Sequence, residues 1–245
     1  MKNDFLRFIL FVTSPLILVL TLAIIQAAWK HLIKLYNKFK YRHLRPTIKC
    51  NKLWYGNDCG FYLNPDLLNK DSIVYSFGVG EDISFDRNLF YKHGCDMYTF
   101  DPTPKSIKWM KEQKEWTPAF YHFGLARESG KAKFYLPKNE KHVSGSMVKY
   151  DGVGEKIGVE MVSFPDIKKS LGHDEIHVVK MDIEGTEYDV IDQIEADQIV
   201  LELHERFFKD GKQKSIRLVN SLRQRGYEIF AGSDREVSFI KRELV

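Results

Sequence analysis

The sequence contains little cysteine. Three cysteines, Cys50, Cys59 and Cys95, stand among 245 residues, and no two of them form a C-x-x-C pair. An odd number of cysteines without such a pair argues against a zinc site, a redox pair or a disulfide framework. A Cys50–Cys59 disulfide would form only in an oxidising compartment. The sequence also has no internal repeat and no low-complexity segment, so a repeat architecture is not expected.

Acidic residues are missing from residues 30–56, where basic residues are concentrated. A basic run of this kind indicates a membrane surface or nucleic acid as the partner. Residues 8–28, which precede the run, carry no charge and are long enough to cross a hydrocarbon core of about 30 Å. We therefore predict a membrane as the partner and no nucleic acid. The basic residues of the run are Lys30, Lys34, Lys38, Lys40, Arg42, Arg45, Lys49 and Lys52.

We divide the chain into a membrane anchor (1–29), a basic stem (30–54) and a catalytic domain (55–245). The anchor is predicted to be one uncleaved transmembrane helix, because a cleaved signal peptide would have an apolar core of about 7–15 residues and a clear A-x-A site. The stem is predicted to be an amphipathic helix on anionic headgroups, with a solvated linker as the alternative. Two cations precede the span and eight follow it, so the positive-inside rule places the catalytic domain in the cytoplasm. The lumenal side of the secretory pathway is the alternative.

A strand and a glycine turn open the catalytic domain. The apolar run at residues 73–77 breaks into G-V-G at residues 78–80, which predicts a buried strand followed by a tight turn. A helix is expected next, with Asp82 as its cap. Residues 97–100 predict a second strand, and Asp101 follows its end.

This order of elements indicates a ligand that carries an adenosine. Glycines let the backbone approach the ligand, the helix N-terminus directs free N–H groups toward it, and the acid accepts hydrogen bonds from ribose hydroxyls. The glycine pattern by itself is also explained by an ordinary strand-to-helix turn, since a third glycine is absent. The acid at the end of the second strand is what favours nucleotide-like binding.

Five motifs follow one another along the chain: VYSFGVGEDISFD, YTFDPTPKSI, HFGLARESGKAKFYLP, VVKMDIEGTEYDVI and VLELHE. Their order resembles the FkbM family of S-adenosylmethionine-dependent methyltransferases, from about Tyr55 to the C-terminus. The resemblance implies a Rossmann-like class I methyltransferase fold, which is an α/β fold with a seven-stranded, mostly parallel sheet and helices on both faces. It also implies S-adenosyl-L-methionine as the cofactor and a hydroxyl of a sugar, lipid or polyketide-like molecule as the methyl acceptor. Two positions depart from the family: Ser76 replaces a frequent acid, and Asp82 replaces a frequent glycine.

The candidate site residues lie at predicted strand ends, because open α/β sheets bind ligands at the carboxyl ends of their strands. The candidate cofactor-binding residues are Phe77, Gly78, Gly80, Asp82, Asp101, Pro102, Phe123, Gly124 and Asp182. The candidate catalytic residues are His204, Asp182, Glu184 and Glu202. His204 is the proposed general base, since an ordinary histidine pKa of about 6.5 suits that role. The catalytic cluster also has the ligand types of a magnesium or manganese site, but its spacing is not distinctive and we predict no metal.

The remaining elements complete the expected sheet. Residues 139–156 are interpreted as a substrate-side loop. The other predicted elements are helices over 103–114 and 212–225, a helix from Thr186, and strands over 119–126, 131–136, 176–181, 198–203, 227–230 and 236–240.

Two other functions remain open. A membrane-tethered binding protein with a methyltransferase fold and no catalysis would account for the departures at Ser76 and Asp82. An NAD-dependent reductase is disfavoured, because the third glycine is missing and the Tyr36–Lys40 pair, the one Tyr-x-x-x-Lys pair, lies in the stem.

Overall fold

The computed structural model describes residues 15–57, 60–138, 145–147 and 153–245. It divides into two compact units between His43 and Leu44. Cys50 and Cys95 are free thiols, and Cys59 lies outside the described residues, so the Cys50–Cys59 bridge stays open.

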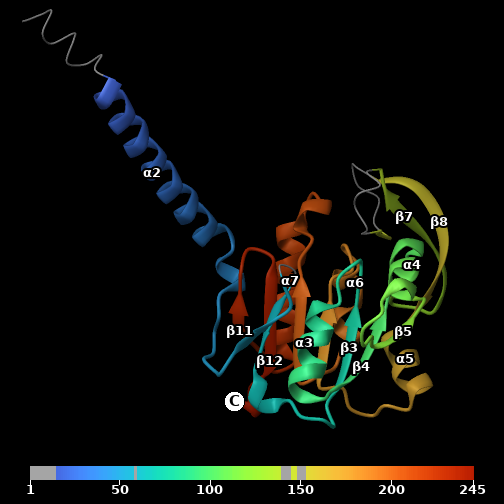
Figure 1. Cartoon of the computed structure of the whole chain (residues 1–245). Helices are drawn as coiled ribbons and strands as arrows, with labels where there is room; N and C mark the ends of the chain where they lie inside the picture. Colours follow the sequence, from blue (N-terminus) through green and yellow to red (C-terminus); the bar gives the residue numbers. More distant parts are fainter. Residues whose placement is uncertain (1–14, 58–59, 139–144, 148–152) are drawn as a thin grey trace, which may run out of the picture. The chain divides into compact units, whose positions relative to one another are not determined.

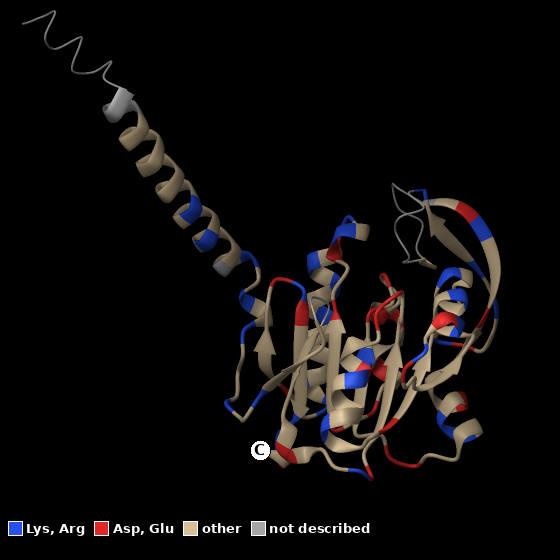
Figure 2. Cartoon of the chain, viewed as in Figure 1, with Lys and Arg blue, Asp and Glu red and all other residues tan. Residues whose placement is uncertain are grey.

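The first unit contains the helix α2 (Pro15–Lys40). Large apolar side chains along it are exposed; Ile24 is 67 % exposed and Trp29 is 65 % exposed. Its lysines occupy the C-terminal part of the helix (Figure 2), which overlaps the predicted stem. Within the described part of the chain, no helix combines the length and the apolar character needed to cross a membrane.

The predicted transmembrane helix over residues 8–28 is therefore not supported. Its first residues lie outside the described ranges, and α2 becomes basic from Lys30 onward.

The second unit is built on a seven-stranded sheet (Figure 1). The strand order is β11-β12-β10-β9-β3-β4-β5. Five strands are parallel: β3 (Ile73–Phe77), β4 (Asp96–Phe100), β5 (Ala119–Tyr121), β9 (Val178–Met181) and β10 (Gln198–Glu202). The last two, β11 (Tyr227–Gly232) and β12 (Glu236–Lys241), form an antiparallel hairpin at one edge. The predicted mixed, mostly parallel sheet of seven strands is thus confirmed.

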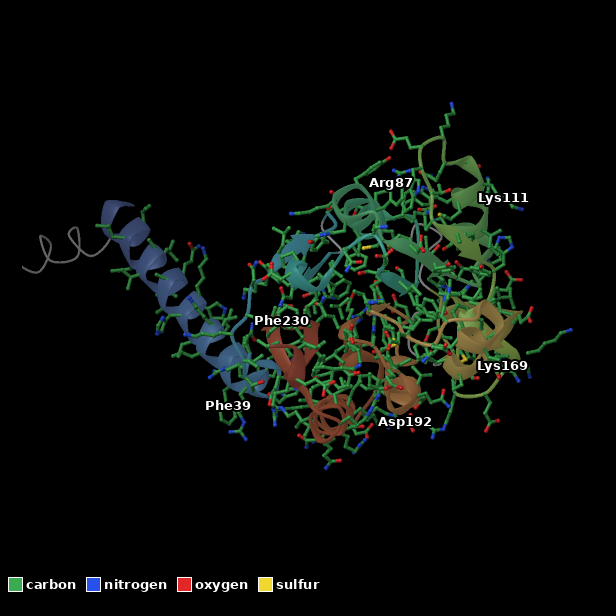
Figure 3. The ribbon with its side chains drawn as sticks, turned by 90° about the horizontal axis from the view of Figure 1, so that it is seen from below. Phe39, Arg87, Lys111, Lys169, Asp192 and Phe230 are labelled. Atoms are coloured by element: carbon green, nitrogen blue, oxygen red, sulfur yellow. The ribbon has the colours of Figure 1, made fainter. Side chains whose placement is uncertain are left out.

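Helices cover both faces of this sheet. Figure 3 shows Arg87 and Lys111 on one side of the sheet and Lys169 and Asp192 on the other. Because both faces are covered, the central strands are buried throughout; Val74, Val178 and Val200 are 0 % exposed. The helices are α3 (Ser84–His93), α4 (Pro104–Glu112), α5 (Phe164–Leu171), α6 (Glu187–Val190) and α7 (Gly211–Gln224). The 3-10 turns are η1 (Arg42–Leu44), η2 (Pro65–Leu67), η3 (Ile191–Gln193), η4 (Glu205–Phe207) and η5 (Arg242–Leu244).

A second, three-stranded sheet was not predicted. It consists of β6 (Gly124–Leu125), β7 (Gly130–Pro137) and β8 (Val153–Val162) in the order β6-β8-β7. The single strand predicted over 119–126 is divided, because β5 pairs with β4 whereas β6 pairs with β8. The predicted loop over 139–156 falls partly in β8 and partly outside the described residues.

The second unit begins earlier than the predicted boundary at residue 55. Leu44 is buried, at 2 % exposure. Thr47 donates its backbone N–H to the carbonyl oxygen of Ile229 in β11, at 2.7 Å. A short hairpin of β1 (Leu53–Tyr55) and β2 (Phe61–Leu63) follows. Residues 44–54 therefore belong to the folded unit, because they contact residues that are distant in the chain. The spacing of apolar residues in the sequence does not indicate such contacts, so the predicted boundary was too late.

Candidate active site

A cavity of about 310 Å³ opens at the carboxyl ends of β3, β4 and β9. Most of the predicted cofactor residues line it: Phe77, Gly78, Gly80, Asp82, Asp101, Pro102, Gly124 and Asp182, together with the predicted catalytic residue Glu184. Phe123, Glu202 and His204 are not among its lining residues. The Phe123 ring is half-buried and packs against Phe100 at a centroid distance of 5.4 Å.

The glycine turn lies directly against the end of β9. Gly78 has a φ of +83°, and a Cβ atom there would stand 1.8 Å from the carbonyl oxygen of Asp182. Its backbone N–H donates to the carbonyl oxygen of Phe100 at 3.0 Å. Only glycine fits this close approach in a left-handed conformation. The turn therefore joins β3, β4 and β9 at one edge of the cavity.

Asp101 is buried and holds that turn in place. Its Oδ2 accepts hydrogen bonds from the backbone N–H groups of Val79 and Gly80 and from the Ser106 hydroxyl, each at 3.0 Å. Its Oδ1 accepts from the backbone N–H and the hydroxyl of Thr103, at 2.8 and 2.6 Å. A carboxylate has about four acceptor sites, so the protein already saturates this one. The predicted contact of Asp101 with a ribose stays a prediction, and the observed role is to join the glycine turn to the start of α4.

The two positions that depart from the family pattern, Ser76 and Asp82, differ in their surroundings. Ser76 is fully buried and does not line the cavity. Asp82 does line it, and its carboxylate accepts from the backbone N–H of Ser84 at 2.7 Å and from the Ser84 hydroxyl at 3.0 Å. Asp82 thus stabilises the first turn of α3, close to the predicted cap role.

Lys180 supplies a positive charge that sequence reasoning missed. It lines the cavity although only 6 % of its surface is exposed, and its Nζ donates to the carbonyl oxygen of Gly78 at 2.5 Å. The sequence could have indicated this residue, because Lys180 directly precedes M-D-I-E-G in the motif VVKMDIEGTEYDVI. Phe134 and Met161 also line the cavity, and they had no signal because they come from the second sheet.

The catalytic residues predicted from the sequence are brought together around one imidazole. His204 Nε2 lies 3.2 Å from Glu184 Oε2, 3.6 Å from Asp182 Oδ1 and 4.0 Å from Glu202 Oε1. The ring is fully buried. On its other side, Nδ1 lies 3.1 Å from Oε1 of Glu187, a buried residue that was not predicted.

The electrostatics of this cluster change the expected role of His204. Burial opposes the charge on the ring, but its contacts with Glu184 and Glu187 outweigh burial and raise the pKa of His204 to about 10. The ring is therefore protonated near neutral pH and has no free electron pair with which to accept a proton. The general-base role assigned to His204 gains no support from this arrangement.

Asp182 connects the cluster to the cavity. Its side chain is 26 % exposed and lines the cavity. Burial raises its pKa to about 6, and the negative charges of Glu202 and Glu184 act in the same direction, while Lys180 and His204 oppose them. The neighbouring Glu184 has a φ of +52°, a left-handed conformation that costs a non-glycine residue about 1–2 kcal/mol.

The comparisons with known proteins give one family model and two curated relatives that are methyltransferase-like. The model of the methyltransferase FkbM domain matches residues 58–229. Probable methyltransferase-like protein 24 from Homo sapiens is 24 % identical over 206 residues, which cover 76 % of this chain and 50 % of that protein. The protein of the same name from Rattus norvegicus is 22 % identical over 202 residues, with 76 % and 48 % coverage. The chain thus spans about half the length of these curated relatives.

Among solved structures, the Methanococcus jannaschii fibrillarin pre-rRNA processing protein aligns over 80 % of this chain and 87 % of its own. The sequence identity is 9 % and the TM-score is 0.39. That TM-score is too low to support an inference.

Proposed function

Because this chain belongs to the FkbM methyltransferase family, we propose that it transfers a methyl group from S-adenosylmethionine to a hydroxyl of a small-molecule, glycan or lipid acceptor. The observation that carries this proposal is the cavity at the carboxyl ends of β3, β4 and β9, with the glycine turn and Asp101 on one side and carboxylates on the other. Open α/β sheets bind their ligands at this place.

The chemistry of the cavity fits this cofactor. Gly78 brings the backbone close to the ligand space, where a side chain would be excluded. Leu125, Phe134 and Met161 offer an apolar lining suited to an adenine ring. The Lys180 ammonium suits the carboxylate of the amino-acid part. These residues would hold the cofactor between the two sheets of the second unit.

The bound cofactor supplies an electrophilic methyl group: a carbon–oxygen bond forms, the carbon–sulfur bond breaks, and the sulfur leaves as a neutral thioether. The protein must align the acceptor hydroxyl, exclude water and receive the hydroxyl proton. Asp182 and Glu184 are the predicted catalytic residues that line the cavity. In this proposal they hydrogen-bond the acceptor hydroxyl, and one of them takes its proton.

The test is methyl transfer by the full chain with methyl-labelled cofactor and a panel of glycans, lipids and small alcohols. We expect label in one acceptor class, detected by mass. Asp101→Asn should weaken cofactor binding by about tenfold or more, because an amide nitrogen cannot accept the hydrogen bonds that hold the glycine turn. If calorimetry shows cofactor binding and no acceptor is methylated, the catalytically inactive binding protein is favoured. Absence of cofactor binding by the folded chain would refute the proposal.

We also propose that α2 attaches the chain to an anionic membrane surface, with the catalytic unit on the cytoplasmic side. The exposed apolar side chains of α2, such as Ile24 and Trp29, support this proposal. So do Lys30 and Lys34, which are one helical turn apart. Flotation of the full chain with anionic vesicles measures this attachment.

A further inference from the structure

The cluster around His204 has features that methyl transfer by itself does not explain. Asp182, Glu202 and His204 each present one ligand atom, and the three atoms lie within 4.8 Å of one another. Glu184 adds a further carboxylate oxygen at 3.2 Å from Nε2. These groups come from the end of β9 and the end of β10, beside the cavity.

The first feature is the imidazole nitrogen that faces the carboxylates. His204 is 0 % exposed, and its Nε2 has no hydrogen-bond partner among the described residues. The contact with Glu184 is close, but it is an ion pair without the direction of a hydrogen bond. A fully buried polar nitrogen without a directed partner is uncommon and calls for a ligand to satisfy it.

The second feature is Glu187, which orients the ring from behind. Its Oε1 lies 3.1 Å from His204 Nδ1 and accepts the backbone N–H of His204 at 2.9 Å. Its Oε2 accepts the backbone N–H of Gly185 at 2.8 Å. A carboxylate that binds one ring nitrogen fixes a proton there, as in many metal-binding histidines. A cation would replace the proton that the other nitrogen, Nε2, carries near neutral pH and would bind the electron pair that this proton leaves.

The third feature is the separation of the ligand atoms. Two ligands about 2.1 Å from a six-coordinate ion lie about 3.0 Å apart when adjacent and about 4.2 Å apart when opposite. The distances from Nε2 to the oxygens of Glu184, Asp182 and Glu202 are 3.2, 3.6 and 4.0 Å. All three are below the larger of these values, so one ion can reach Nε2 together with any one of these oxygens.

Positively charged side chains neutralise only part of the negative charge of this cluster. Arg206 lies 3.4 Å from Glu202 and 3.6 Å from Glu184, and Arg235 lies 3.2 Å from Glu202. Both arginines are about half exposed and approach from the solvent side. The Lys180 ammonium also faces Asp182 but is bonded to the carbonyl oxygen of Gly78. Among the described residues, the His204 ring is the only basic group within 4.0 Å of the Asp182 carboxylate.

We propose that Asp182, Glu202 and His204 bind a divalent cation of the magnesium and manganese class, with Glu184 as an adjacent carboxylate. Oxygen-rich ligands with one imidazole suit manganese best among these ions. The cation would occupy the space toward which Nε2 points. Since Asp182 also lines the cavity, an ion bound there would contact the acceptor hydroxyl and favour its ionisation. That last role rests on the proposed function, whereas binding of the ion does not.

The experiment is titration of the full chain with Mn²⁺ alone, without cofactor, followed by electron paramagnetic resonance of the free ion. We expect one saturable site. Asp182→Asn and Glu202→Gln keep the side-chain shapes and should each weaken Mn²⁺ binding by about tenfold or more. Glu187→Gln, which removes the group that orients His204, should weaken it by roughly 10–100-fold. Asp192→Asn is the matched control, because Asp192 pairs with Arg127 outside the cluster, and should leave binding unchanged.

Circular dichroism and thermal unfolding establish that each variant is folded. No saturable Mn²⁺ binding by the wild-type chain would overturn the inference, as would equal binding by folded Asp182→Asn and Glu202→Gln. The two proposals fail separately: a chain that binds Mn²⁺ but not S-adenosylmethionine retains this site and loses the proposed function. A chain that binds the cofactor but not Mn²⁺ retains support for the proposed function and refutes the metal site.

Discussion

Asp101 and Asp86 are both buried acids, but they differ in how many hydrogen bonds their carboxylates accept. Asp101 accepts five hydrogen bonds from the protein, so its charge is well solvated by the fold. Asp86 in α3 is 1 % exposed, and its Oδ1 has no hydrogen-bond partner among the described residues. Burial raises the pKa of Asp86 to about 6, and the charge of Lys180 only partly opposes this shift. The first acid organises the turn, and the second keeps its proton to a higher pH than an ordinary aspartate does.

The buried Asp86 predicts how stability depends on pH. Its folded pKa of about 6 exceeds its ordinary value of 3.8, so the folded state binds a proton more tightly than the unfolded chain. Its contribution is fully present below about pH 4 and is lost as the pH rises through about 6, for a total near 3 kcal/mol. Asp86→Asn has no proton to lose at this position and should therefore lack this dependence.

Denaturant unfolding at several pH values between 4 and 8 measures the effect. The Asp182 pKa is also raised, but it acts in both wild type and variant, so the difference between them reports on Asp86. A difference in unfolding free energy that stays constant across this range would contradict the prediction.

Among the strands, the carboxyl ends of β3 and β9 are in direct backbone contact. The backbone N–H of Asp182 donates to the carbonyl oxygen of Phe77 at 3.0 Å, and Gly78 approaches the carbonyl oxygen of Asp182. The glycine turn and the carboxylate side of the cavity therefore meet at one junction. A change at this junction affects both sides together.

Gly78→Ala tests the junction, and Gly172→Ala is its matched control. Both glycines have positive φ, +83° and +71°, but a Cβ at position 172 meets nothing within 4 Å. Gly172→Ala should cost about 1–2 kcal/mol of stability through backbone strain alone. Gly78→Ala adds a collision with backbone and should cost at least about 3 kcal/mol, with loss of cofactor binding. Equal unfolding free energies for the two variants, measured with denaturant, would show that the junction is not tight.

At the scale of the whole molecule, the chain joins a basic helix to a catalytic unit. A lysine near an anionic membrane surface contributes about 1 kcal/mol of binding free energy. Replacing Lys30 and Lys34 together by glutamine should therefore weaken vesicle binding by roughly tenfold to thirtyfold. Lys131→Gln with Lys133→Gln, on the exposed side of β7, is the control and should bind as wild type. Attachment that is equal on neutral and anionic vesicles would contradict a role for the basic face.

Local patterns in the sequence, together with the family resemblance, predicted the main sheet and most of the residues that line the cavity. Buried strands such as β3 and β9 are apolar runs, and their carboxyl ends carry the glycine turn and the D-I-E-G turn. Parallel strands place such ends at one edge. For this reason, nine predicted residues line one cavity.

Three features depend on contacts between distant residues: the second sheet, the start of the folded unit at Leu44 and the protonation state of His204. The pairing of β6 with β8 and the contact of Thr47 with Ile229 join residues far apart in the chain, and no local period records such contacts. The charge of an imidazole depends on which carboxylates surround it and on their burial. The sequence by itself determined that acids and a histidine stand at neighbouring strand ends. The placement of Glu187 behind His204 decided that the ring faces the carboxylates as a charged group, because hydrogen bonds and burial exist only in the folded chain.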